Sequence, residues 1–169
     1  MATKTLEEYY INNNPGNIKV SKGWAGDFYI GLKGGKYKKF DTKAMGLANI
    51  IHTMKNYMET DIDKIIGIYA QSDESGDVNP NYSEELKKHY NVLQNIDFDN
   101  DEQLINIMKG VTTLENPSDG KYSADKYYKD TDYIDAIKLY RESKLFEGQG
   151  TIDEQIKDAE MQGLNLQWT

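Results

Sequence analysis

A glutamate stands where the apolar stripe of one predicted helix ends. Three apolar residues share one face of the segment 101–115 at the i, i+4, i+7 spacing: Leu104, Met108 and Val111. The next position on that face is Glu115. A carboxylate beside apolar side chains is partly desolvated, which disfavours its charged form, and a carboxylic acid kept neutral in this way can act as a general acid. A solvated carboxylate at a helix end is the alternative interpretation.

An asparagine-rich string near the N-terminus is the most distinctive in the chain. Residues 12–18 read Asn-Asn-Asn-Pro-Gly-Asn-Ile, so that four amide side chains surround a Pro-Gly turn. Amides offer donors and acceptors together, which suits the hydroxyl and N-acetyl groups of a sugar. A turn without a ligand is the alternative.

Apolar periodicity predicts several helices and one β-hairpin around these features. The hairpin covers residues 27–40, where aromatic and polar residues alternate on both sides of a Lys-Gly-Gly turn. Asp41 or Thr42 is expected to cap the helix that follows, and Asn100 and Gln103 to form a capping box on the glutamate helix. Besides the stripe that ends at the glutamate, the expected buried faces consist of Ala44, Leu47, Ala48, Ile51, Met54 and Met58, of Ile62, Ile65, Ile66 and Tyr69, of Tyr82, Leu86 and Tyr90, and of Ile134, Ile137 and Tyr140. The fold class expected is α+β, mainly α, with one small β-hairpin.

Composition narrows the classes of function. A chain of 169 residues suffices for one domain with a core, and its net charge of −8 argues against nucleic acid as a partner. No stretch reaches the roughly 18 apolar residues of a membrane span, and the polar N-terminus predicts no signal peptide. The absence of cysteine rules out disulfides, thiol catalysis and cysteine-ligated zinc.

No cofactor and no metal are expected. The segment 73–84 has acidic and amide residues at the spacing of a calcium loop, but Val78 occupies the sixth position, where such a loop needs glycine. His52 and His89 have no further histidine with which to form a zinc site.

Several strings, in this order, resemble the lysozyme-like peptidoglycan hydrolase domains of phages and prophages whose elements are circularly permuted. The matching strings are the asparagine string at 12–18, Gly23-Trp24-Ala25-Gly26, Phe40-Asp41-Thr42-Lys43-Ala44-Met45-Gly46-Leu47-Ala48, Ile65-Ile66-Gly67-Ile68-Tyr69-Ala70 with Glu74, Asn81 and Tyr82, and Leu114-Glu115-Asn116. The resemblance covers roughly residues 10–143. The chain departs from the family pattern at Tyr69 (Trp in the family), Gln71 (Pro), Thr113 (often His) and the inserted Pro117-Ser118-Asp119.

The resemblance implies a lysozyme-like fold and cleavage of the β-1,4 bond between N-acetylmuramic acid and N-acetylglucosamine. Glu115 would protonate the leaving oxygen. A water activated by a second carboxylate, from Asp119, Asp73 or Glu74, would make the protein a lysozyme, whereas attack by the 6-hydroxyl of the sugar would make it a lytic transglycosylase. No second carboxylate is as well placed as Glu115, which favours the single-glutamate route. The residues expected to line the glycan groove are Asn13, Asn14, Asn17, Trp24, Tyr69, Glu74, Asn81 and Tyr82.

The expected catalytic domain is 1–146, and 147–169 is an appendage that begins at a Glu-Gly-Gln-Gly stretch. Three apolar residues near its end suit attachment to a virion protein: Leu164, Leu166 and Trp168. An enzyme of this kind would act from the host cytoplasm at lysis or from the virion. A non-catalytic virion or peptidoglycan-binding protein with the same fold is the alternative function.

Overall fold

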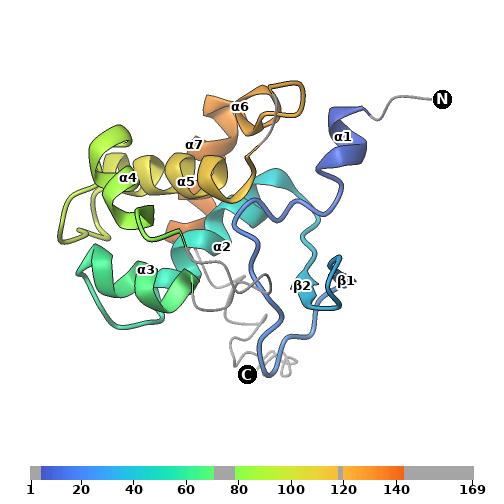
Figure 1. The fold of residues 1–169 in the computed structure, drawn as a ribbon, viewed down its shortest axis with the longest axis horizontal. Coiled ribbons are helices and arrows are strands. Elements are labelled where there is room, and N and C mark those ends of the chain that lie inside the picture. The colour runs from blue at the N-terminus through green and yellow to red at the C-terminus, as the bar shows by residue number, and fades with distance from the viewer. Residues whose placement is uncertain (1–4, 71–78, 118–119, 143–169) are drawn as a thin grey trace.

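The computed structural model describes residues 5–70, 79–117 and 120–142 (Figure 1). The predicted appendage and its boundary at residue 146 lie outside these residues, as do the candidate site residues Asp73, Glu74 and Asp119. The described residues include Glu115 and the asparagine-rich segment 12–18, here named the asparagine loop.

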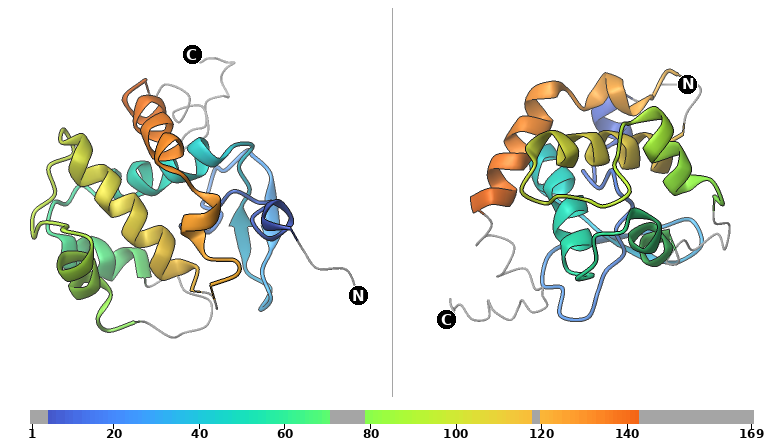
Figure 2. Two further views of the ribbon diagram at one scale, coloured as in Figure 1. Left: turned by 90° about the horizontal axis from the view of Figure 1, so that it is seen from above. Right: turned by 90° about the vertical axis from the view of Figure 1, so that its left-hand side faces the viewer.

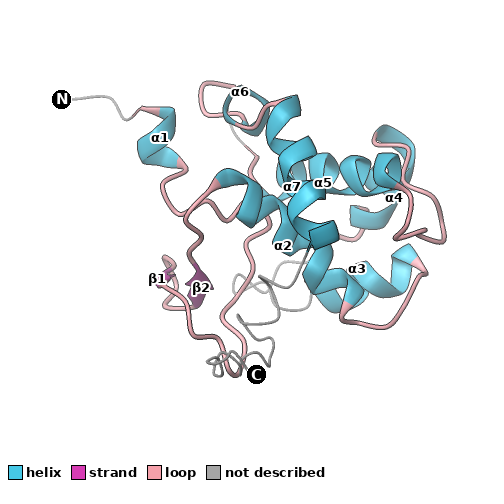
Figure 3. Cartoon of the chain, turned by 180° about the vertical axis from the view of Figure 1, so that it is seen from behind, coloured by secondary structure: helices cyan, strands magenta, loops and turns pink. Residues whose placement is uncertain are grey.

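The described chain is mainly helical, with one small antiparallel hairpin, as predicted for a mainly α member of the α+β class (Figure 3). In chain order, its elements are α1 (Leu6–Tyr9), β1 (Phe28–Ile30), β2 (Lys36–Lys38), α2 (Lys43–Lys55), α3 (Ile62–Ala70), α4 (Tyr82–His89), α5 (Asp101–Glu115), α6 (Ala124–Tyr127) and α7 (Asp130–Glu142). None of the described helices is long and apolar enough to cross a membrane.

Helix α2 lies at the centre of the helical core, where it packs on α7 and α5. Thr42 caps it by accepting a hydrogen bond from the backbone nitrogen of Met45 at 3.1 Å, the second of the two caps considered from the sequence. On α5, Leu104, Met108 and Val111 are completely buried, which confirms the predicted apolar stripe. Burial of this stripe holds α5 in the core and thereby sets the position of Glu115, the last residue of the helix.

Three details of the helices differ from the sequence prediction. Met58 is 88% exposed because α2 ends at Lys55 and Met58 itself has a positive φ of 59°. Ile134 is half-exposed, since the buried face of α7 consists of Tyr133, Ala136 and Ile137. The side chain of Gln103 leaves the expected capping box and pairs with the backbone of Asn91 and Leu93.

The hairpin lies at the opposite end of the molecule from α3 and α4 (Figures 1 and 2). Its two strands pair in the register Phe28↔Lys38, Tyr29↔Tyr37 and Ile30↔Lys36, and a further bridge joins Lys19 to Tyr37. Gly34 adopts the positive φ of 91° that the turn requires. The predicted hairpin is confirmed, and its pairing with Lys19 ties the asparagine loop to it.

The asparagine loop packs directly on the start of α2. A Cβ atom at Gly46 would lie 1.8 Å from the backbone oxygen of Asn13, a distance that no side chain allows. The backbone nitrogen of Phe40 also donates to the oxygen of Asn12 at 3.0 Å. The loop is thus held against the helical core by its own backbone.

Candidate functional site

Glu115 is the last residue of α5, and both oxygens of its half-buried carboxyl group accept hydrogen bonds. Asn17 donates from Nδ2 to Oε1 at 2.9 Å, and Tyr82 donates from its hydroxyl to Oε2 at 2.9 Å. The helix ends here because Asn116 leaves the helical conformation (φ −128°, ψ 57°) and Pro117 follows. Three separate parts of the chain therefore meet at one carboxyl group.

Asn17 reaches this position through its backbone conformation and a second hydrogen bond. Its φ is 50°, a left-handed conformation that asparagine adopts more readily than most residues. The same Nδ2 donates to the backbone oxygen of Glu115 at 3.0 Å. Both amide protons of Asn17 are thereby directed at one residue, which makes Asn17 a positioning group for the carboxyl.

Two further hydrogen bonds hold the asparagine loop around the site. Asn116 donates from Nδ2 to the oxygen of Pro15 at 2.7 Å, and Tyr69 donates its hydroxyl to the oxygen of Gly16 at 2.5 Å. Asn116 was not among the candidate residues, although the Glu-Asn string that contains it was part of the resemblance. The loop is consequently fastened to α3 and to the end of α5 at neighbouring positions.

Tyr69 and Tyr82 are core residues, 7% and 5% exposed. Burial, followed by the charge of Glu115, holds the pKa of both hydroxyls well above the ordinary value of 10. Both hydroxyls therefore keep their protons and act as donors throughout the physiological range. Both residues were expected to line the glycan groove, but stacking of a sugar ring on them does not fit their burial, because stacking needs an exposed ring face.

Asn14, which was expected to line the glycan groove, uses its side chain for hydrogen bonds within the protein. Its side chain is 7% exposed and donates to the oxygens of Ile18 and Lys38 at 2.9 and 2.8 Å. Its Oδ1 accepts from the nitrogen of Ile18 at 2.9 Å. With both amide protons used inside the protein, Asn14 holds the loop to the hairpin, and we leave it out of the proposed glycan contacts.

Asn13 is half-buried and links the loop to both neighbouring segments. Its Nδ2 donates to the oxygen of Phe40 at 3.2 Å, and its Oδ1 accepts from the Tyr127 hydroxyl at 3.3 Å. One amide proton remains beyond these bonds. Asn13 is thus better placed than Asn14 to contact a ligand.

Trp24 and Asn81 are the other described candidates. Trp24 is half-buried, donates from Nε1 to the oxygen of Asp27 at 2.9 Å and has the Lys38 ammonium 4.6 Å from its ring centroid. Asn81 is exposed directly before Tyr82 and makes no capping hydrogen bond with its side chain. Glu74 is outside the described residues, together with the other two candidates for a second carboxylate.

A cavity of about 1170 Å³ lies against the last turn of α5. Thr113, Leu114 and Asn116 help to line it, whereas Glu115 is not among its described lining residues. Tyr128 also lines it, and the hydroxyl of this 2% exposed residue has no hydrogen-bond partner among the described residues. The cavity therefore adjoins the candidate site but does not contain its carboxyl group.

Within residues 5–70, 79–117 and 120–142, no group of three or more acidic or histidine side chains could hold a metal ion. No protein-family model matches the chain, and a comparison with curated proteins finds no match. What the protein does is therefore inferred from its own residues and from their geometry around Glu115.

Proposed function

We propose that this protein cleaves the glycan strands of peptidoglycan with Glu115 as the general acid. The observation that supports the proposal is the carboxyl group at the end of α5, held on both oxygens by Asn17 and Tyr82. The asparagine loop and the glutamate are two of the features that carry the resemblance to phage lysozyme-like domains. They meet in space although they are 98 positions apart.

The geometry suits proton donation. The hydrogen bonds from Asn17 and Tyr82 fix the orientation of the carboxyl group of Glu115. The proton that Glu115 would pass to the glycosidic oxygen would therefore leave from a group that is already held in place. Because both donors are anchored, the carboxyl group needs little reorganisation when the bond breaks.

The reaction after protonation follows one of two routes. In the single-glutamate route, the 6-hydroxyl of the sugar attacks the anomeric carbon and returns its proton to Glu115, which has become the base. In the hydrolytic route, a second carboxylate activates a water molecule. We favour the first route, since the positioned carboxyl group of Glu115 supplies both proton transfers.

The proposed glycan contacts are Asn13, Trp24 and Asn81, with Asn17, Tyr69 and Tyr82 positioning the catalytic group. Asn81 is exposed beside Tyr82, and Asn13 retains an amide proton. Trp24 offers a half-buried indole at the base of the hairpin. Glu74 remains a proposed contact from the resemblance.

The test is digestion of purified peptidoglycan by the full chain and by Glu115→Gln. The substitution keeps the volume of the side chain but removes the proton donor, and loss of general-acid catalysis costs about 10²–10⁴-fold in rate. Glu102→Gln, in the exposed first turn of the same helix, is the matched control and should keep full activity. Mass spectrometry of the products separates the routes, because transglycosylation leaves 1,6-anhydro ends and hydrolysis leaves reducing ends.

Two results would overturn the proposal. Glu115→Gln activity within a factor of two of the wild type removes Glu115 from the mechanism. A wild-type chain that sediments with peptidoglycan but releases no fragments instead supports the non-catalytic alternative, a virion or wall-binding protein.

A further inference from the structure

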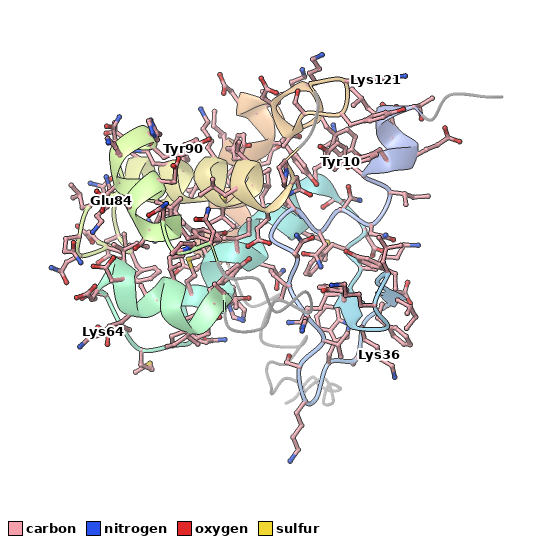
Figure 4. All side chains as sticks on the ribbon, in the orientation of Figure 1. Tyr10, Lys36, Lys64, Glu84, Tyr90 and Lys121 are labelled. Atoms are coloured by element: carbon pink, nitrogen blue, oxygen red, sulfur yellow. The ribbon has the colours of Figure 1, made fainter. Side chains whose placement is uncertain are left out.

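Positive charge is concentrated around the hairpin of an otherwise acidic protein. The segment 19–39 contains one aspartate, Asp27, and six lysines, a formal charge of +5 in a chain whose total is −8: Lys19, Lys22, Lys33, Lys36, Lys38 and Lys39. Figure 4 shows Lys36 on the hairpin, at the end of the molecule away from Lys64 on α3 and Glu84 on α4. Near an anionic surface, this charge distribution would turn the hairpin toward the surface.

The same hairpin exposes a stripe of apolar side chains. Phe28 and Ile30 are 50% and 57% exposed, and their alternate positions place them on one face of β1. Leu32 follows in the turn and is 105% exposed. Lys36 pairs with Ile30 across the strands, and its Nζ lies 5.1 Å from the centroid of the Phe28 ring. Apolar and cationic groups thus share one exposed face.

The opposite face of the hairpin carries Tyr29 and Tyr37. These two residues pair across the strands with their ring centroids 5.6 Å apart, and Tyr37 is 9% exposed. On the face of the apolar stripe, the buried strand residue is Lys38, the partner of Phe28, whose Nζ lies 4.6 Å from the centroid of the Trp24 ring. The apolar side chains of the stripe themselves remain exposed. Exposed apolar side chains grouped on one element indicate an interaction surface.

We propose that the face formed by Phe28, Ile30, Leu32 and Lys36, here named the hairpin face, docks on the surface of an anionic lipid membrane. Apolar side chains enter the boundary between headgroups and acyl chains, while nearby lysines remain at the level of the phosphates. A soluble polyanion such as a nucleic acid would use the lysines alone and leave the apolar stripe in water. The proposal goes beyond glycan cleavage, since it does not involve Glu115.

The experiment is sedimentation of the full chain with vesicles of phosphatidylcholine, with and without phosphatidylglycerol. We expect binding to the anionic vesicles that weakens as salt is added, and none to pure phosphatidylcholine. Leu32→Ser should weaken partitioning about tenfold by removing buried apolar area. Lys36→Gln should weaken it about fivefold by removing one charge at the surface.

Matched controls come from exposed residues of the same types elsewhere. Met58→Ser removes an apolar side chain that is 88% exposed after α2, and Lys64→Gln removes an exposed lysine from α3. Both should bind vesicles like the wild type. Leu32→Trp adds a third tryptophan to the chain, and its emission is obtained by subtracting the wild-type spectrum. This emission should shift to the blue with anionic vesicles, because the new indole enters an apolar layer.

Three results would overturn the proposal. Equal binding to both vesicle types, or none to either, would remove the electrostatic basis. Unchanged binding of Leu32→Ser would show that the apolar stripe is not used. Complete competition by heparin or duplex DNA, with no blue shift for Leu32→Trp, would assign the lysines to a soluble polyanion.

Discussion

The side-chain amide of Asn17 spans the backbone and the carboxyl group of Glu115, donating to the carbonyl oxygen at 3.0 Å and to Oε1 at 2.9 Å. This pair joins the asparagine loop to the end of α5. One nitrogen makes both hydrogen bonds, so a substitution at Asn17 should alter the position of the carboxyl group while leaving the hydrophobic core intact. Asn14 instead binds the backbone of Ile18 and Lys38, so the roles of the two asparagines can be separated by mutation.

Asn17→Gly should reduce peptidoglycan cleavage at least tenfold while lowering the free energy of unfolding by only about 1 kcal/mol. Glycine tolerates the positive φ at this position, so the substitution removes the amide without adding strain. Initial rates and thermal melts of the purified variant measure the two effects.

Asn14→Ala is the matched comparison and should show the reverse pattern. It leaves buried backbone partners of Ile18 and Lys38 unpaired, which costs about 2–3 kcal/mol of stability, while the folded fraction stays active. A stable Asn14→Ala variant with a large catalytic defect would return Asn14 to the group of proposed glycan contacts.

Tyr82→Phe should shift the alkaline limb of the pH–rate profile to higher pH. The hydroxyl donates to Oε2 of Glu115, and this hydrogen bond favours the ionised carboxylate, so its removal favours the protonated acid. Tyr69→Phe is the comparison, since its hydroxyl donates to the backbone oxygen of Gly16. An unmoved limb in Tyr82→Phe would show that the hydrogen bond does not tune the acid.

Gly46→Ala should destabilise the protein severely, because the new Cβ atom would lie 1.8 Å from the backbone oxygen of Asn13. Gly67→Ala, on the exposed side of α3, meets no atom within 4 Å and should stabilise the protein by about 0.5–1 kcal/mol through helix propensity. Denaturant unfolding of both variants measures the contrast. Equal stabilities would mean that the loop does not pack on α2 at this point.

The protein should lose stability as the pH falls from 6.5 toward 4, in part because of His52. Burial, followed by the charge of Lys38, lowers the pKa of His52 from 6.5 to about 4 in the folded state. Between these values the unfolded chain binds a proton that the folded chain does not, so the contribution is complete above pH 6.5 and is lost by pH 4. The loss is on the order of 2–3 kcal/mol for such a shift.

The test of this pH dependence is the difference between variants, since carboxylates titrate in the same window. His52→Gln should flatten the decline of the free energy of unfolding between pH 6.5 and 4. Parallel curves for wild type and His52→Gln would contradict the prediction.

The helices and the hairpin were predictable because their signals are local. The stripe of Leu104, Met108 and Val111 repeats within one helix, and the hairpin turn needs only a Gly at a positive φ. The same signals placed Glu115 at the end of its helix. They were less reliable at Met58 and Ile134, because burial there depends on where the helix stops and on which neighbour covers it.

The sequence by itself determined where the longer helices and the hairpin form and that a carboxyl group ends the stripe of α5, since hydrophobic spacing and turn chemistry act over a few residues. Only the tertiary structure decided how the asparagines divide their roles. Asn14 is buried under the hairpin while Asn17, three residues later, reaches Glu115. The reason is that a hydrogen-bond partner 98 positions away is selected by how the loop docks on α2, α3 and α5, and no local pattern encodes that docking.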